Sequence, residues 1–199
     1  MEKSTKKESN ERNLQDYLSL GYIYLLILGI GREVIYYRFL DVNILSYSNV
    51  LDVLLSPIVY LSSKPIIVLL FIILTAVIYF INKANYKKKL KDDSISESGK
   101  VTAKNEILKG TLILLSLGIF GFFIGTGIGS GISYGSKLKK GEFEASHQIT
   151  FLSDKELSVK LIGNNSQYIF YVLENEKQVT ISPISGNVKM ISKLPPKNE

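Results

Sequence analysis

PIIVLLFIILTAVIYFIN, from Pro65 to Asn82, is the stretch that decides the fold class of this chain of 199 residues. Its eighteen residues carry no charge, and Lys64 and Lys83 stand at its two ends. An apolar run of this length matches the hydrocarbon core of a bilayer, and basic residues are typical of its borders. The run therefore predicts a membrane-spanning helix over 65–82.

A second apolar run, YLSLGYIYLLILGIG, begins at Tyr17 and is followed by Arg32 and Glu33. Fifteen helical residues cover only about 22 Å, which is short of a hydrocarbon core of about 30 Å. We therefore expect the span to cover 17–37, with Arg32 and Glu33 snorkelling or facing protein.

A third run, unusually rich in glycine, contains only one charge, Lys109, near its start. It predicts a span over 107–134. The three spans define a transmembrane region of 17–136, preceded by a polar tail over 1–16 in which we expect no regular structure.

The segment 49–61 is apolar but contains Asp52 and Pro57. At thirteen residues it is too short to cross a bilayer alone, so we interpret it as an interfacial or re-entrant helix. A fourth span is the alternative, and it would place the C-terminus on the other side of the membrane.

The formal net charge of +6 comes mostly from the segment 83–109, which has eight lysines against four acids, rather than from a basic face. Lysines concentrate on the cytoplasmic side of membrane proteins, so the basic loop 83–106 predicts a cytoplasmic N-terminus and an extracytoplasmic C-terminus. No nucleic-acid recognition motif accompanies the charge. The first apolar run has a leader of balanced charge and no Ala-x-Ala site, so we expect a retained anchor. The topology determinants are Lys83, Lys87, Lys88, Lys89 and Lys91.

The segment 143–194 changes to short runs rich in β-branched and aromatic residues, separated by turn residues. These runs predict a small antiparallel sheet or barrel. Alternation along 167–174 indicates a strand that is buried on both faces. The expected strands are 147–152, 157–162, 167–174, 178–182 and 188–192, with turns at 163–166, 175–177 and 185–187.

Two stretches, YYRFLDVNILSY over 36–47 and KLIGNNSQYIFYVLENEKQVTISP over 160–183, resemble segments of small uncharacterised bacterial inner-membrane proteins. The resemblance implies a bacterial membrane protein. It assigns no activity and no site residue.

Glycines recur every four residues along the third span in two sets. Spacing of this kind clears one helix face for close approach of a neighbouring backbone. The neighbour is another span of the same chain or a second copy of the protein. No dinucleotide fingerprint or phosphate-binding loop fits these glycines. The sets are Gly121, Gly125 and Gly129, and Gly127, Gly131 and Gly135.

Candidate chemistry is sparse. The chain has no cysteine and one histidine, His147, which we interpret as a solvated or hydrogen-bonded side chain. Asp154 and Glu156 are interpreted as solvent-facing acids beside a turn. No catalytic, metal-binding or cofactor-binding residues are predicted. Three ionisable residues at membrane depth, Arg32, Glu33 and Asp52, are expected in ion pairs or at the interface.

Two function hypotheses follow. The first is a membrane-anchored, non-enzymatic interaction or assembly module that presents the β domain at the surface of the bacterial cytoplasmic membrane. The second is a pore or channel-like homo-oligomer built around the glycine-rich span. The expected partners are the lipid bilayer and another protein or a second copy, without nucleic acid.

Overall fold

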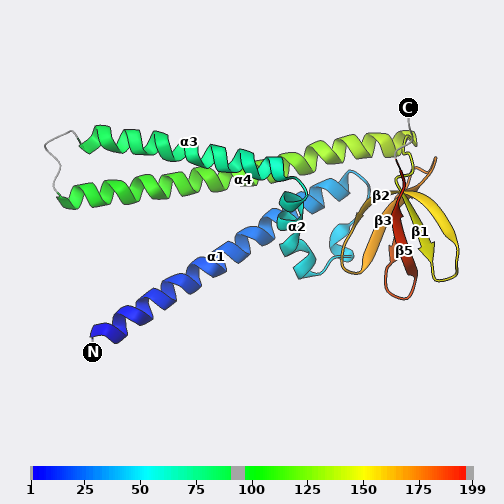
Figure 1. Ribbon diagram of the computed structural model, residues 1–199, viewed down its shortest axis with the longest axis horizontal. Helices are drawn as coiled ribbons and strands as arrows, with labels where there is room; N and C mark the ends of the chain where they lie inside the picture. Colours follow the sequence, from blue (N-terminus) through cyan, green and yellow to red (C-terminus); the bar gives the residue numbers. More distant parts are fainter. Residues whose placement is uncertain (1, 91–96, 196–199) are drawn as a thin grey trace. The chain divides into compact units, whose positions relative to one another are not determined.

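The computed structural model describes residues 2–90 and 97–195, with side chains described for 15–85 and 109–195. The helices are α1 (Glu2–Arg38), α2 (Val50–Ser62), α3 (Pro65–Leu90) and α4 (Glu97–Lys140), with a short 3-10 helix at Ile44–Ser46 (Figure 1). The strands are β1 (His147–Phe151), β2 (Glu156–Asn164), β3 (Tyr168–Leu173), β4 (Thr180–Pro183) and β5 (Val188–Lys193).

Three helical segments in the described chain are long and apolar enough to cross a membrane: Gln15–Arg38, Pro65–Asn85 and Lys109–Lys140. The three long apolar helices that the sequence predicts are thus present. α2 is apolar but shorter, at 13 residues. The helices extend past their apolar parts, since α1 begins at Glu2 rather than after the polar residues 1–16. Lys and Glu have good helix propensity, so polar sequence of this kind continues a helix that has already begun.

The chain divides into two compact units, residues 1–57 with 124–199, and residues 58–123. In the second unit α3 packs against the N-terminal half of α4. The ring centroids of Phe71 and Phe122 lie 5.1 Å apart, and the Asn82 amide donates a hydrogen bond to the Thr111 hydroxyl. Later residues of α3 thus meet earlier residues of α4, so the two helices are antiparallel.

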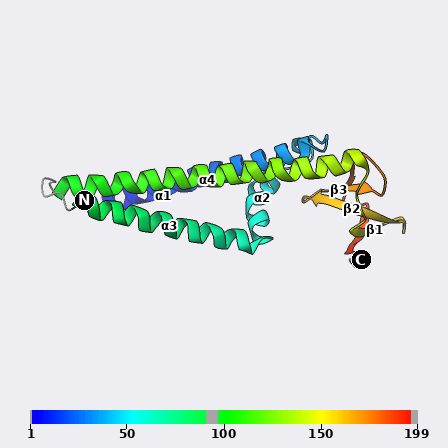
Figure 2. The ribbon, with the colours of Figure 1, turned by 90° about the horizontal axis from the view of Figure 1, so that it is seen from above.

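In the first unit the end of α1 packs against the C-terminal half of α4 (Figure 2). A Cβ built on Gly127 would lie 2.9 Å from the carbonyl oxygen of Arg32, and one on Gly135 would lie 2.6 Å from that of Phe39. Later residues of α1 thus meet later residues of α4, so the two helices are parallel. α4 ends at Gly141, whose φ of +72° suits glycine, and the Glu142 amide donates to the Lys137 carbonyl.

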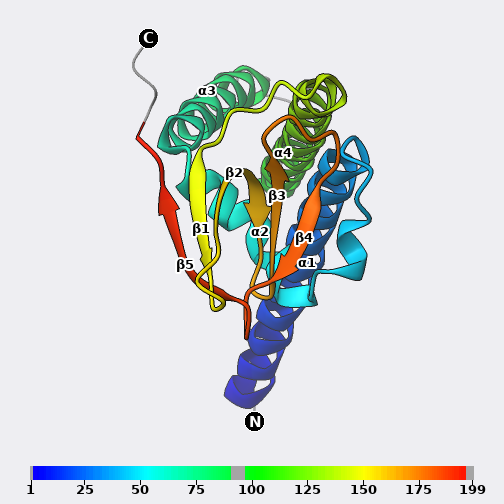
Figure 3. The same ribbon diagram turned by 90° about the vertical axis from the view of Figure 1, so that its right-hand side faces the viewer.

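The five strands form one antiparallel sheet in the order β4-β3-β2-β1-β5, with β4 and β5 at its edges (Figure 3). The predicted antiparallel sheet is confirmed. Only Ile184–Asn187 connect the two edge strands, and the Val188 amide donates to the Ile184 carbonyl, so this connection is a turn. A flat sheet would separate its outer strands by about 19 Å. The sheet must therefore curl toward a barrel, although no ladder joins β4 to β5 among the described residues.

Both faces of the sheet are covered. Ile149, Val159 and Ile169 are fully buried inside the curl, whereas Phe170 and Val172 face a second cluster made with the helices. Neighbouring residues of β3 thus enter different clusters, as the alternation along 167–174 predicted. This second cluster joins the sheet to the ends of α1 and α4 by burial of side chains from Tyr36, Tyr37, Leu40, Val42, Ile44, Leu138 and Phe143.

Candidate functional site

The contact between the sheet and the helix ends is the most extensively built polar and aromatic region in the described chain. Its aromatic part pairs Tyr37 with Phe170 at 5.1 Å between ring centroids, and Tyr47 with Tyr168 at 5.3 Å. The Tyr37 hydroxyl lies directly over Gly163, where a side chain would leave it no room. The two stretches that resemble bacterial membrane proteins, 36–47 and 160–183, therefore pack against each other.

Asp52 lies in the polar part of this contact. The Asn49 side chain accepts a hydrogen bond from the Asp52 amide at 2.8 Å, and the Asp52 carboxylate accepts one from the Asn49 amide at 3.2 Å. This reciprocal arrangement caps the N-terminus of α2. The same carboxylate accepts hydrogen bonds from the Ser166 amide and hydroxyl at 3.1 and 3.0 Å. Asp52 thus connects α2 to the turn between β2 and β3.

Asn165 secures the same turn from its other side. Its side-chain amide donates to the Tyr47 carbonyl at 2.8 Å, while its side-chain oxygen accepts from the Tyr168 amide at 2.8 Å. Sequence reasoning singled out neither Asn165 nor Ser166. The pattern Asn49-x-x-Asp52 was a readable capping signal, but nothing local in 163–166 indicates its distant partner.

Arg32 and Glu33 form an ion pair, and their side chains are 15% and 19% exposed. The Ser56 hydroxyl donates to the Glu33 carboxylate at 2.7 Å. A group that is buried among apolar helices is costly unless it is paired, and this contact supplies the partner. The hydrogen bond from Ser56 to Glu33 thus connects α2 to α1. The two helices also approach closely at Gly29, where a Cβ would collide with the Val53 carbonyl.

The two glycine sets occupy different surroundings. Gly127, Gly131 and Gly135 face the end of α1, with Arg32, Ile35 and Phe39 in contact distance of the Cβ positions. At Gly121, Gly125 and Gly129 a Cβ would meet no atom of another described segment within 4 Å. One set therefore permits close helix packing inside the chain, and the other faces open space.

The predicted topology lysines are only partly covered by the described residues. The Lys83 ammonium lies 5.7 Å from the ring centroid of Tyr79. Lys87, Lys88 and Lys89 belong to the last turns of α3, but their side chains lie outside the described residues, as does all of Lys91.

The remaining polar candidates lie on the sheet. The Ser146 hydroxyl is 2.9 Å from Nδ1 of His147, and Asp154 pairs with Lys189 at 2.7 Å on the surface. Glu156 accepts a hydrogen bond from the Gln148 amide at 2.6 Å. Burial lowers the pKa of His147, and the charges of Lys193 and Lys160 lower it further. Within the described residues no three acids or histidines are grouped as metal ligands.

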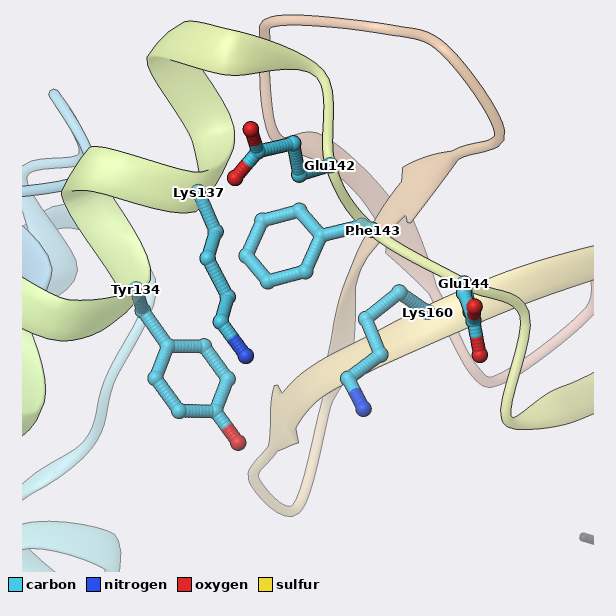
Figure 4. Close-up of a pocket in the computed structure, with 6 residues that line it drawn as sticks. All are labelled: Tyr134, Lys137, Glu142, Phe143, Glu144 and Lys160. Atoms are coloured by element: carbon cyan, nitrogen blue, oxygen red, sulfur yellow. The ribbon is translucent and has the colours of Figure 1, made fainter. Parts of the chain in front are cut away.

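A hollow of about 260 Å³ opens beside the C-terminal end of α4 (Figure 4). α4 contributes Tyr134 and Lys137, and β2 contributes Lys160. The segment between α4 and β1 supplies the other lining residues, Glu142, Phe143 and Glu144. Sequence reasoning did not bring these six residues together, because they come from three segments without a shared motif.

Comparison with protein-family models, with curated proteins and with solved structures finds no match.

The geometry itself therefore defines what this region can do. Carboxylates, amides and hydroxyls in the contact between the sheet and the helices form hydrogen bonds with one another. These bonds stabilise the contact rather than prepare a group for reaction. The hollow is different, because the ammonium groups of Lys137 and Lys160 turn toward open space (Figure 4).

Proposed function

We propose that this chain is an integral membrane protein of three spans and a non-enzymatic interaction or assembly module, which presents its sheet at the extracytoplasmic surface of the bacterial cytoplasmic membrane. The observation that carries the proposal is the buried cluster between the sheet and the ends of α1 and α4. A sheet held in this way has a fixed orientation relative to those helices. A flexible tether would not provide that orientation.

The number of spans is supported by the parallel packing of α1 and α4. Successive spans alternate in direction, so α1 and α4 are parallel if α2 does not cross and antiparallel if it does. At 1.5 Å per residue the 13 residues of α2 also cover only about 20 Å. Both observations favour a short helix that stays on the side of the sheet.

The orientation is supported by the distribution of basic residues along the chain. The segment 83–109 contains eight lysines and connects the second and third proposed spans. The sheet follows the opposite end of the third span, and basic residues concentrate on the cytoplasmic side. We therefore propose that the sheet lies outside, in spite of Lys137, Lys139 and Lys140 in the last turn of α4.

Cysteine labelling tests this topology directly, since the natural chain has no cysteine. Ser185→Cys, in the turn before β5, should react with an impermeant maleimide in intact cells. Ser94→Cys lies outside the described residues, in the lysine-rich loop, and should react only after permeabilisation. The opposite pattern would reverse the orientation, and release of the chain from membranes by alkaline carbonate would contradict insertion.

A pore-forming homo-oligomer is the second candidate, and one observation favours it. At Gly121, Gly125 and Gly129 of α4 a Cβ would meet no atom of another described segment within 4 Å, so these positions leave room for another copy. Purified protein in liposomes should then conduct ions, whereas an interaction module should not.

A further inference from the structure

The hollow beside the end of α4 contains a convergent group of hydrogen-bond donors. Figure 4 shows the ammonium groups of Lys137 and Lys160 and the hydroxyl of Tyr134 turned toward the same open space. In the described part of the chain these three groups make no hydrogen bond and no ion pair. Cationic and hydroxyl donors in this arrangement suit a phosphate.

Acidic groups line the same hollow. Glu142 lies 3.8 Å from Lys140, and because both side chains are about 60% exposed this pair is weak. Glu144 forms no ion pair with a described residue. Two lysines and two glutamates give a lining with no net charge, which disfavours a simple anion. It is complementary to a group that carries a positive and a negative charge together.

Size and position restrict the ligand further. Sites for complete small molecules usually measure about 300–1,000 Å³, so this hollow suits a smaller group. Tyr134 and Lys137 lie in the last two turns of α4, and tyrosine and lysine are common where a span meets the lipid headgroups. A lipid can place its headgroup in such a hollow while its chains stay in the bilayer.

We propose that this hollow binds the headgroup of a zwitterionic phospholipid that carries a primary ammonium. Lys137, Lys160 and Tyr134 donate to the phosphate, and Glu144 accepts from the ammonium, with Glu142 at the rim. The inference rests on the proposed function, because it requires the end of α4 to lie at the membrane surface.

Native mass spectrometry of the full chain in detergent tests the proposal. The probes are phospholipids with identical acyl chains and ethanolamine, choline or glycerol headgroups. The ethanolamine lipid should be retained about fivefold more than the others. The choline headgroup has no N–H to donate to Glu144, and the glycerol headgroup has no positive charge.

Variants assign the preference to the hollow. Lys160→Gln and Glu144→Gln should each remove it, and Lys139→Gln, in the same turn of α4 but outside the lining, should keep it. Stronger retention of the glycerol lipid, equal retention of all three, or an equal loss in Lys139→Gln would overturn the proposal. Soluble phosphoethanolamine at the same concentration should not displace the lipid, and equal competition would identify a free metabolite instead.

The two proposals fail separately. Cysteine labelling reports membrane insertion without any headgroup preference. A chain that is labelled as expected but shows no lipid preference overturns only the headgroup site, and a chain that carbonate extracts overturns the proposed function itself.

Discussion

Asp52 shows how one side chain can connect two distant parts of the chain. Its carboxylate caps α2 together with Asn49 and also accepts two hydrogen bonds from Ser166, which is 114 positions away. The sequence identified Asp52 as a polar residue at membrane depth. The structure gives its half-buried carboxylate specific hydrogen-bond partners.

Asp52→Ala should lower the free energy of unfolding by about 2 kcal/mol, because it removes a helix cap and frees the turn between β2 and β3. Hydrogen exchange of 163–167 should accelerate in the same variant. Glu174→Ala, at an exposed acid, is the control and should change neither measurement. Unchanged exchange in Asp52→Ala would show that the carboxylate does not hold the turn.

His147 should titrate below its usual pKa of about 6.5, because burial and the nearby Lys193 and Lys160 disfavour its charged form. Just below pH 6.5 the unfolded chain then binds more protons than the folded chain, so the free energy of unfolding rises with pH through that window. The contribution of His147 to stability is fully present above pH 6.5. A titration of the imidazole by NMR measures the midpoint. Lys193→Gln should raise it partway toward 6.5, and a wild-type midpoint above 6.5 would contradict the assignment.

At the scale of elements, α4 presents two glycine faces with different neighbours. A Cβ at Gly135 would lie 2.6 Å from the backbone oxygen of Phe39, directly after α1, which cannot move aside as a side chain can. A Cβ at Gly125 would meet nothing within 4 Å outside its own helix. The four-residue spacing is the same on both faces, so spacing alone does not identify the packed one.

Gly135→Ala should destabilise the chain by about 1–3 kcal/mol through overpacking of α1 on α4. Gly125→Ala is the matched control, and it should be neutral or slightly stabilising because alanine has the higher helix propensity. Thermal unfolding in detergent compares the two. Equal destabilisation would mean that both faces are packed.

Gly125→Leu tests contact between copies of the chain, because a Cβ at position 125 meets open space within one chain. A reporter of self-association between spans should lose signal with Gly125→Leu and keep it with Ile119→Leu if copies pack through this face. Equal signal from both variants would rule out a glycine-mediated homo-oligomer through Gly121, Gly125 and Gly129.

For the whole molecule, the central property is that the sheet and the helix ends share a buried cluster. Phe170 is fully buried, and its ring contacts both Tyr37 and Tyr47. Phe170→Ala should therefore cost about 3–5 kcal/mol and increase hydrogen exchange in 36–47 and 168–173 together. Phe120→Ala, at a ring that is 38% exposed, is the control. Faster exchange in the sheet alone would indicate a tethered domain rather than a docked one.

The sequence by itself determined the three apolar helices and the five strands. Span length, the alternation along β3 and the turn residues are local properties, and the backbone confirms the turns with positive φ at Asn175 and Gly186. The sequence also misjudged the ends of two helices, because apolar content does not mark where a helix begins or ends. α1 begins in the polar region 1–16, and α4 continues past 134 to Lys140.

Only the tertiary structure decided which surfaces meet. The docking of 36–47 on 160–183, the partners of Asp52, the packed glycine face and the hollow between Lys137 and Lys160 all join residues from separate segments. Local periodicity shows that a residue is buried or that a helix face is clear, but it does not name the partner. The partner depends on how the whole chain closes around its shared core, and that choice is made by packing and hydrogen bonding over long sequence separations.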